Sequence, residues 1–330
     1  MREGFAYSAF TERGQALAQK LCASLGGQVR GEGGVSLADW TAEQFPLRAG
    51  LVFIGAAGIA VRAIAPHVLS KAADPAVVCV DERGEYVIPL LSGHLGGANE
   101  LARQIVALTG GVAVITTATD INGLFAVDLW AKRQNLLLLQ PERIRTVSAK
   151  ILRGETVAVD CPWPISGERP EGVTLTAPGD VAVDYRRRTD AALQLVPRVL
   201  SLGIGCRRGT TAEQLETAFE AFCFERGILP QAIRNAASIT VKADEQGLLD
   251  FCRNRNLPVS FYSAARLQSA PGTYTASAFV ESRVGVDNVC ERASVLVSGG
   301  VLVEEKFARD GVTFALALRA PMLDWRWRHG

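Results

Sequence analysis

The feature that most constrains the fold of this chain is a repeated alternation between short apolar runs and amphipathic helical patterns. Phe5–Phe10 precedes a helical pattern that ends at Gly26, and Leu51–Ala56 precedes one that stops at Pro66. Apolar runs of this length followed by helical periodicity are typical of strands whose helices cover a sheet. The pattern therefore predicts the α/β class, with two three-layer α/β domains joined by a small middle module.

The bounds of these parts follow from where the alternation stops and resumes. It runs through residues 1–134, gives way to short apolar runs and a loop rich in Pro, Gly and Glu over 135–197, and resumes over 198–330. We expect an N-terminal α/β domain, a middle module or linker, and a C-terminal α/β domain with those bounds. The closing residues Trp325–His329 are expected to form a frayed tail.

Composition argues against several classes of function. The 330 residues carry 35 Lys and Arg against 34 Asp and Glu, so the chain lacks the excess positive charge that nucleic-acid and anionic-membrane binders use. The most apolar stretch is well short of the roughly 20 residues that span a membrane, and the N-terminus has no apolar signal segment. We expect a cytoplasmic protein with no nucleic-acid or membrane partner.

Histidine and cysteine are too sparse to suggest a metal held by the protein. The three histidines are His67, His94 and His329, and the seven cysteines form no CxxC pair. Catalytic and structural metal sites usually need two or three imidazole or thiolate ligands. We therefore expect no metal ligands.

The loop from Ser92 to Gly97 lies where an expected strand gives way to an expected helix. Gly93, Gly96 and Gly97 would let backbone N–H groups approach a ligand, and the helix N-terminus would favour an anion. His94, placed among these small residues, could act as a general acid or base near neutral pH. Alternatively, the glycines serve only a tight turn and His94 caps a backbone carbonyl. On the residues alone both interpretations stay open.

A second polar loop joins the strand expected over Val112–Thr117 to the helix expected over Leu124–Arg133. Its polar side chains include Thr116, Thr117, Thr119 and Asp120. They could orient a water molecule or hold polar groups of a ligand, and they could equally be ordinary helix caps. If the sheet is mostly parallel, this loop and the loop of His94 emerge at the same end of the strands.

Two further glycine-containing loops carry cations. Gly58 is followed by Arg62 one turn into a helix, and Gly205 is followed by Arg207 and Arg208. Each loop could clamp a carboxylate. The alternatives are close helix–sheet packing at Gly58 and, at Gly205, a dinucleotide-binding turn, for which the glycine spacing is a weak signal.

Several motifs, taken in order, resemble the cobalt-precorrin-5A hydrolase family of cobalamin biosynthesis. They are Gly58–Pro66, Asp74–Val78, Ser92–Ala102 and Ile115–Gly123. Gly203–Gly209 is similar to the entry to that family's C-terminal domain, which also occurs as a separate small protein. The chain departs from the family pattern around Val286–Ser294, where Glu291-Arg292-Ala293 stands in place of a Glu-Pro-Ala-like turn.

The resemblance implies an enzyme that opens the δ-lactone of cobalt-precorrin-5A with water and releases acetaldehyde to give cobalt-precorrin-5B. The substrate is then a cobalt-bearing tetrapyrrole, and because the cobalt travels with it no cofactor is needed. A homodimer, or contact with other enzymes of the pathway, is compatible with this role. Two alternatives from other classes remain: a non-catalytic carrier of corrinoid intermediates, and a nicotinamide-dependent oxidoreductase that uses Gly203–Gly209.

Within this hypothesis His94 activates water, Asp120 or Glu100 orients His94, and backbone N–H groups near Gly96 and Gly97 stabilise the oxyanion. The glycine loops and their cations would bind the acidic substituents of the substrate. The expected binding residues are Gly58, Arg62, Ser92, Gly93, Gly96, Gly97, Asn99, Thr116, Thr117, Thr119, Gly205, Arg207 and Arg208.

Overall fold

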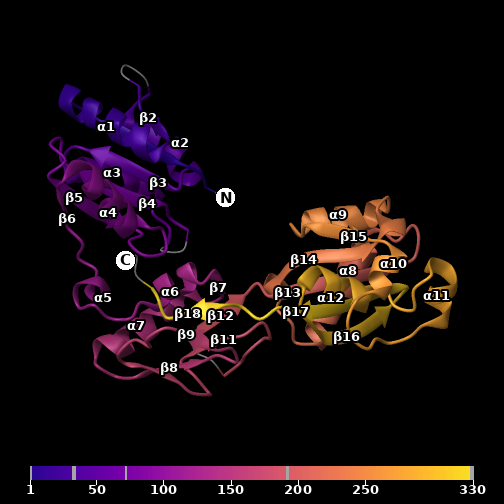
Figure 1. Cartoon of the computed structure of the whole chain (residues 1–330). Coiled ribbons are helices and arrows are strands. Elements are labelled where there is room, and N and C mark those ends of the chain that lie inside the picture. The colour runs from indigo at the N-terminus through magenta and orange to yellow at the C-terminus, as the bar shows by residue number, and fades with distance from the viewer. Residues whose placement is uncertain (1, 32–34, 71–72, 191–192, 328–330) are drawn as a thin grey trace. The chain divides into compact units, whose positions relative to one another are not determined.

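The computed structural model describes residues 2–31, 35–70, 73–190 and 193–327 (Figure 1). Its chain divides into two units, Met1–Leu129 and Trp130–Gly330. The first unit contains a six-stranded sheet, and the second contains two five-stranded sheets and a two-stranded one. Helices cover these sheets, so the predicted α/β class is confirmed.

The sheet of the first unit changes direction once. In spatial order its strands are β2 (Gln28–Val29), β1 (Phe5–Ala9), β3 (Gly50–Ile54), β4 (Ala76–Val80), β5 (Tyr86–Leu91) and β6 (Val112–Ala113). The first four strands run parallel, β5 runs antiparallel to β4, and β6 runs parallel to β5. The segments that follow β5 and β6 therefore leave the sheet at one end, and the segment that follows β3 leaves it at the other.

Helices cover both faces of this sheet because successive strand residues point to opposite sides. Val52 and Ile54 pack with α1 (Glu12–Leu25) and α4 (Ala98–Thr109). Leu51 and Phe53 pack with α2 (Leu37–Leu47) and α3 (Ala57–Ile64), which the short helix η1 (Ala65–His67) follows. The domain thus has the three layers that the alternation predicted.

The segment after β6 differs from the prediction. The strand expected over Val112–Thr117 ends at Ala113, because β6 is an edge strand and pairs with β5 through two residues only. The helix expected over Leu124–Arg133 is replaced by the short α5 (Ala118–Ile121) and by α6 (Val127–Arg133). Gly123, with a φ of 69°, lies in the turn between these two helices.

The middle part of the chain folds into a sheet of its own. Its strands, in spatial order, are β10 (Val173–Leu175), β8 (Val157–Asp160), β11 (Val181–Val183), β12 (Leu193–Pro197) and β7 (Leu136–Leu138). Only β7 runs antiparallel to its neighbour. The helices of this part are η2 (Pro141–Arg143) and α7 (Ile144–Leu152).

The end of the chain is anchored to this middle part. Strand β18 (Leu323–Asp324) pairs with β9 (Ile165–Ser166). Trp325 is 3 % exposed and stacks on Trp130, with ring centroids 5.3 Å apart. The expectation of a frayed tail is therefore wrong for these residues, because backbone pairing and aromatic burial hold them; His329 lies outside the described residues.

The third sheet belongs to the C-terminal part. Its strands, in spatial order, are β15 (Val259–Tyr262), β14 (Ile233–Ile239), β13 (Leu200–Cys206), β17 (Val312–Leu318) and β16 (Val301–Arg309). Its helices are α8 (Ala212–Glu225), η3 (Pro230–Ala232), η4 (Thr240–Lys242), α9 (Gln246–Asn254), α10 (Ala264–Gln268), α11 (Ala278–Val284) and α12 (Cys290–Ser298). Helices α8 and α9 pack on one face, and α10 and α12 pack on the other.

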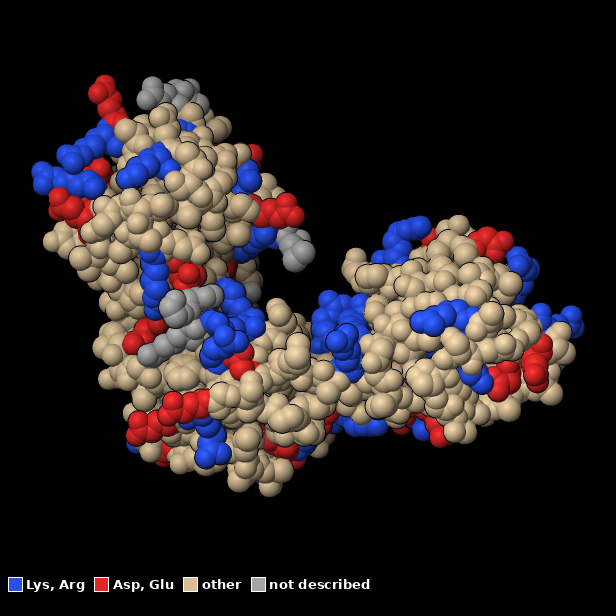
Figure 2. Space-filling model, viewed as in Figure 1, with Lys and Arg blue, Asp and Glu red and all other residues tan. Residues whose placement is uncertain are grey.

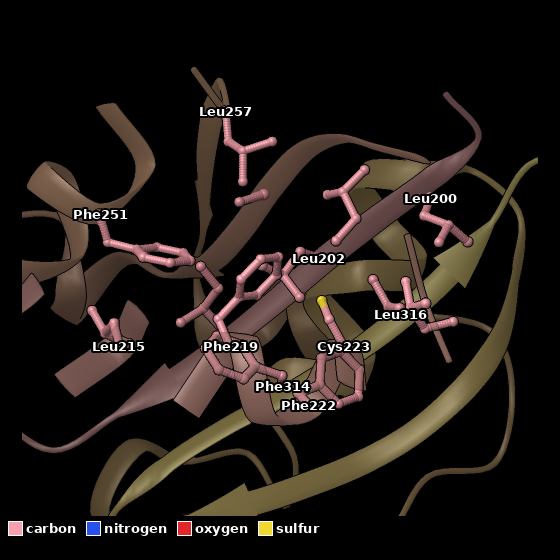
Figure 3. Close-up of a cluster of buried hydrophobic side chains, with 14 of the residues drawn as sticks. Leu200, Leu202, Leu215, Phe219, Phe222, Cys223, Phe251, Leu257, Phe314 and Leu316 are labelled. Carbon is pink, nitrogen blue, oxygen red and sulfur yellow. The ribbon is translucent and has the colours of Figure 1, made fainter. Parts of the chain in front are cut away.

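Aromatic side chains fill the core between the sheet and helices α8 and α9 (Figure 3). Phe219 and Phe222 from α8 and Phe251 from α9 each have ring contacts with Phe314 of β17. Burying an aromatic side chain of this size contributes about 1.5–3 kcal/mol. Leu200, Leu202 and Ile204 of β13 belong to this core, so the core anchors the strand that leads into the loop after β13.

On the other face of the same sheet, the region that departs from the family pattern is also buried. Glu291 is fully buried, and its carboxylate accepts hydrogen bonds from Thr275 N and Oγ1 and from Lys306 N at 2.7–2.9 Å. Arg292 donates to Asp287 at 2.7 Å. The carboxylate of Glu291 thus ties three separate segments together, which is a structural role.

Two global features agree with the composition. The face of the molecule in Figure 2 carries Lys and Arg interspersed with Asp and Glu, as expected for a net charge of +1. Among the residues that the structure describes, no helix combines the length and the apolar character needed to cross a membrane.

Candidate active site

The loop that carries His94 closes on itself through its own backbone. Gly97 N donates to His94 O at 3.1 Å, Ala98 N donates to Ser92 O at 3.1 Å, and Asn99 N donates to Gly93 O at 3.0 Å. The N–H of Gly97 is therefore not available as the oxyanion donor that the sequence suggested. Helix α4 begins directly after this turn in the chain.

The glycines of the loop are explained by this turn. A Cβ on Gly96 would overlap Ser92, and a Cβ on Gly93 would lie 2.8 Å from Asn99 Oδ1. Gly97 adopts a φ of 89°, which side chains disfavour. The tight-turn interpretation thus holds for the glycines, while the side chain of His94 contacts carboxylates.

His94 lies between two aspartates. Its Nε2 is 2.6 Å from Asp120 Oδ2, and its Nδ1 is 3.1 Å from Asp128 Oδ2. The three side chains are 12 %, 10 % and 9 % exposed, respectively. Such an arrangement fixes the orientation of the ring and leaves a small part of each group open to solvent.

The parallel pairing of β5 and β6 brings these groups together. His94 follows β5, while Asp120 on α5 and Asp128 in the first turn of α6 follow β6. The prediction that the two loops emerge at the same end of the strands is confirmed. Sequence reasoning missed Asp128, which is 34 residues from His94 and stands where an acidic residue is ordinary in a helix.

The carboxylate of Asp120 has further donors around it. Asn99 Nδ2 donates to Asp120 Oδ2 and to Thr117 Oγ1, each at 3.0 Å, and Arg103 donates to Asp120 Oδ1 at 2.9 Å. Asn99 and Arg103 are four residues apart on α4 and so share one face of the helix. Asn99 and Thr117 were expected at the site, whereas Arg103 was missed.

The opposite charges of His94 and Asp120 shift the pKa of each group. Burial lowers the pKa of His94, but the hydrogen bonds and negative charges of Asp128 and Asp120 outweigh burial and raise it. Burial raises the pKa of Asp120, but His94 and Arg103 outweigh burial and lower it. These opposite shifts favour an imidazolium against an ionised aspartate. A raised pKa makes His94 a stronger base once its proton is lost.

Comparison with known proteins identifies the family. Models described as cobalamin synthesis G N-terminal, cobalamin biosynthesis central region and cobalamin synthesis G C-terminus match residues 39–120, 125–218 and 200–317. A cobalt-precorrin-5A hydrolase of Salmonella typhimurium is 33 % identical over 96 % of this chain and 98 % of its own. The chain belongs to the cobalt-precorrin-5A hydrolase family.

Two other relatives match the chain over different shares of its length. A cobalt-precorrin-5A hydrolase of Priestia megaterium is 33 % identical over 82 % of this chain and 78 % of its own. Protein CobE of Sinorhizobium sp. is 32 % identical over 36 % of this chain and 79 % of its own.

In this member of the cobalt-precorrin-5A hydrolase family, the second carboxylate on His94 is Asp128 rather than Glu100. Glu100 accepts a hydrogen bond from Gln104 at 3.4 Å and lies 3.8 Å from Arg103. Thr119 is 6 % exposed, whereas Thr116 is exposed at the surface. The two threonines therefore differ in their access to a ligand.

Gly58 and Arg62 lie at the opposite end of the strands from His94. The turn before Gly58 follows β3, and Gly55 N donates to Val80 O at the end of β4. Gly58 and Arg62, which were expected to bind the substrate together with the loop of His94, therefore do not lie beside that loop. The reason is that β5 reverses direction relative to β4.

The loop of Gly205, Arg207 and Arg208 lies in the second unit, and its surroundings are occupied by the protein itself. A Cβ on Gly203 would overlap the carbonyl oxygen of Cys290, and a Cβ on Gly205 would overlap Thr313 Oγ1.

Two donors of this loop lie near carboxylates of the same domain. Gly209 N donates to Glu245 Oε1 at 2.6 Å, and Arg208 lies 3.6 Å from Asp244. Glu245 is 6 % exposed. An internal carboxylate thus takes the place of the anion that the glycine-rich sequence suggested.

Proposed function

We propose that this chain is a cobalt-precorrin-5A hydrolase, which opens the δ-lactone of cobalt-precorrin-5A with water and releases acetaldehyde to give cobalt-precorrin-5B. Relatives with this name match the chain over most of its length. The observation that carries the proposal in this chain is His94, partly exposed and held between Asp120 and Asp128.

The arrangement suits hydrolysis of an ester. Asp128 accepts a hydrogen bond from His94 Nδ1, so Nε2, which lies against Asp120, is the ring nitrogen that acts as the base once the imidazolium has lost a proton. A water molecule that enters at Nε2 gives its proton to this nitrogen while its oxygen attacks the lactone carbonyl carbon. When the ring C–O bond breaks, the leaving oxygen takes that proton, which yields a carboxylic acid and an alcohol.

Asp120 has a separate part in this scheme. Its Oδ2 is 2.6 Å from Nε2, so it must give way to the water or accept a hydrogen bond from it. Asn99 Nδ2 donates to both Asp120 and Thr117, so it holds the carboxylate of Asp120 in place beside the imidazole ring. The acetaldehyde then leaves when the freed alcohol loses its O–H proton and its C–C bond breaks. The electron pair of that bond passes to the macrocycle, which takes up a proton in place of the lost one.

The remaining roles at the site belong to substrate binding. The residues proposed for it are Ser92, Asn99, Thr116, Thr117 and Thr119, while Gly93, Gly96 and Gly97, which were also expected to bind substrate, shape the turn of this loop. The cobalt is part of the substrate, and we propose no cofactor of the protein. A cytoplasmic location and a homodimer, or contact with other enzymes of the pathway, stay predictions from the sequence.

The two alternative functions differ in what supports them. A non-catalytic carrier would use the same site and would bind the intermediate without consuming it. The nicotinamide-dependent alternative needs Gly203–Gly209 to face a phosphate, but Cys290, Thr313 and Glu245 occupy its surroundings. The geometry therefore disfavours the oxidoreductase.

The deciding experiment is incubation of the purified protein with cobalt-precorrin-5A, followed by assay of acetaldehyde and of the ring-opened product. The proposal expects stoichiometric acetaldehyde and loss of the lactone. Tight binding with no acetaldehyde would identify a carrier instead. Heat-denatured protein controls for spontaneous hydrolysis.

A further inference from the structure

Arg103 is a cation at the candidate active site that the scheme above does not use. Its guanidinium donates to Asp120 Oδ1 at 2.9 Å and lies 3.8 Å from Glu100 Oε2. Its side chain remains 45 % exposed, against 10 % for Asp120. The group that bonds to the carboxylate next to His94 thus also reaches solvent.

The guanidinium keeps donors for a further partner. An arginine has five N–H donors in a planar fork that matches the two oxygens of a carboxylate. The bond to Asp120 uses one of these donors, and a separation of 3.8 Å from Glu100 is too long for a hydrogen bond. One N–H group of the guanidinium is therefore bonded to Asp120, while other N–H groups can still donate to a ligand.

We infer that Arg103 binds a carboxylate of the substrate and so places the substrate beside His94. The inference rests on the proposed function of this site and adds the chemical group that the site recognises. Because Asp120 aligns the guanidinium before the substrate arrives, less side-chain freedom is lost on binding.

A matched control is present in the same domain. Arg83 lies in the turn between β4 and β5, at the opposite end of β5 from His94, and is 61 % exposed. It lies 3.6 Å from Glu85, so it too is an exposed arginine beside a carboxylate. Its replacement removes the same charge from the same domain without touching the site.

The test is equilibrium titration of the protein with cobalt-precorrin-5A, for Arg103→Gln and Arg83→Gln, each in a His94→Ala background, which consumes little of the substrate, and in a His94→Ala/Asp120→Asn background. We expect Arg103→Gln to raise the dissociation constant about tenfold to a hundredfold in both backgrounds. Arg83→Gln leaves it unchanged. Arg103→Lys gives an intermediate value, because it keeps the charge and loses the fork.

The Asp120→Asn background shows whether Arg103 binds the substrate directly or only holds Asp120 in place. If Arg103 acts only by holding Asp120, Arg103→Gln has no effect on affinity in that background, and the inference is overturned while the hydrolase remains. Equal weakening by Arg83→Gln also overturns it, since only overall charge would then matter. A wild-type protein that binds the substrate and releases no acetaldehyde overturns the proposed reaction and leaves the role of Arg103 standing; one that binds nothing overturns both.

Discussion

Two glycine-rich loops of this chain, Ser92–Gly97 and Gly203–Gly209, are alike in sequence and differ in what surrounds them. Both connect a strand to a helix. The first presents His94 to two aspartates at a place that solvent reaches. In the second, backbone and side chains of the same domain fill the space, and Glu245 accepts the N–H of Gly209.

The difference shows what a glycine in such a loop indicates about its surroundings. In each loop two glycines mark a close approach to backbone or side-chain atoms: Gly93 and Gly96 in the first loop, Gly203 and Gly205 in the second. Whether a ligand can use the loop depends on the segments that other parts of the chain bring to it. The four predictions below test this contrast.

The largest effect is expected for His94→Ala. If His94 is the base, turnover of cobalt-precorrin-5A falls by about two to four orders of magnitude. Acetaldehyde release measures this loss, and circular dichroism confirms that the variant is folded. Near-normal turnover would remove His94 from the role of base and make Asp120 the better candidate.

A second large effect, on stability, is expected in the other loop. Gly203→Ala places a methyl group against the carbonyl oxygen of Cys290 and lowers the free energy of unfolding by about 3 kcal/mol. Gly209→Ala is the control, since its Cβ meets no atom within 4 Å and the cost of its φ of 76° is about 1 kcal/mol. Urea unfolding measures both. Equal losses would contradict the packing role of Gly203.

Asp128→Asn tests the carboxylate that sequence reasoning missed. Turnover falls about a hundredfold, because the ring loses the group that orients it. The pH dependence of turnover tests the same point. Because the pKa of His94 is raised, turnover is expected to fall off on the acidic side at a pH above the ordinary pKa of 6.5. Loss of the Asp128 charge lowers the pKa of His94 and moves this acidic limb to lower pH. An unmoved limb would show that Asp128 does not act through His94.

The smallest effect is expected for Glu245→Gln. The neutral side chain accepts the N–H of Gly209 more weakly and loses its ion pair with Lys242, so the free energy of unfolding falls by about 1 kcal/mol. The hydrogen bonds from Gly209 and Lys242 outweigh burial and lower the pKa of Glu245. Its contribution is thus present above the ordinary pKa of 4.5 and is lost as the pH falls through the folded pKa. Chemical denaturation at pH 7 and at low pH should show the variant and the wild type converge; a constant difference would contradict this.

Much of the fold could be predicted because its signals are local. The strands at Phe5–Ala9 and Gly50–Ile54 and the helix that ends at Gly26 lie within a residue or two of their expected bounds. Apolar periodicity and glycine at a helix end act over a few residues, so the sequence shows them directly. The edge strand β6 was expected too long, because its length depends on its one neighbour.

The site was predictable in part. His94, Asn99, Thr117 and Asp120 were expected to converge because two parallel strands carry their segments to the same end of the sheet. Asp128 was not, since an aspartate at the start of a helix is common and nothing near it in sequence points to a histidine far upstream.

The sequence by itself determined the α/β class, the strand–helix order and the residues capable of acid–base chemistry, because each depends on neighbours along the chain. The tertiary structure decided which of these residues meet. The reversal of β5 against β4 sends Arg62 to one end of the strands and His94 to the other, and the fold of the C-terminal part brings Glu245 to Gly209. Such contacts depend on strand direction and on segments distant in sequence, and side-chain chemistry alone encodes neither.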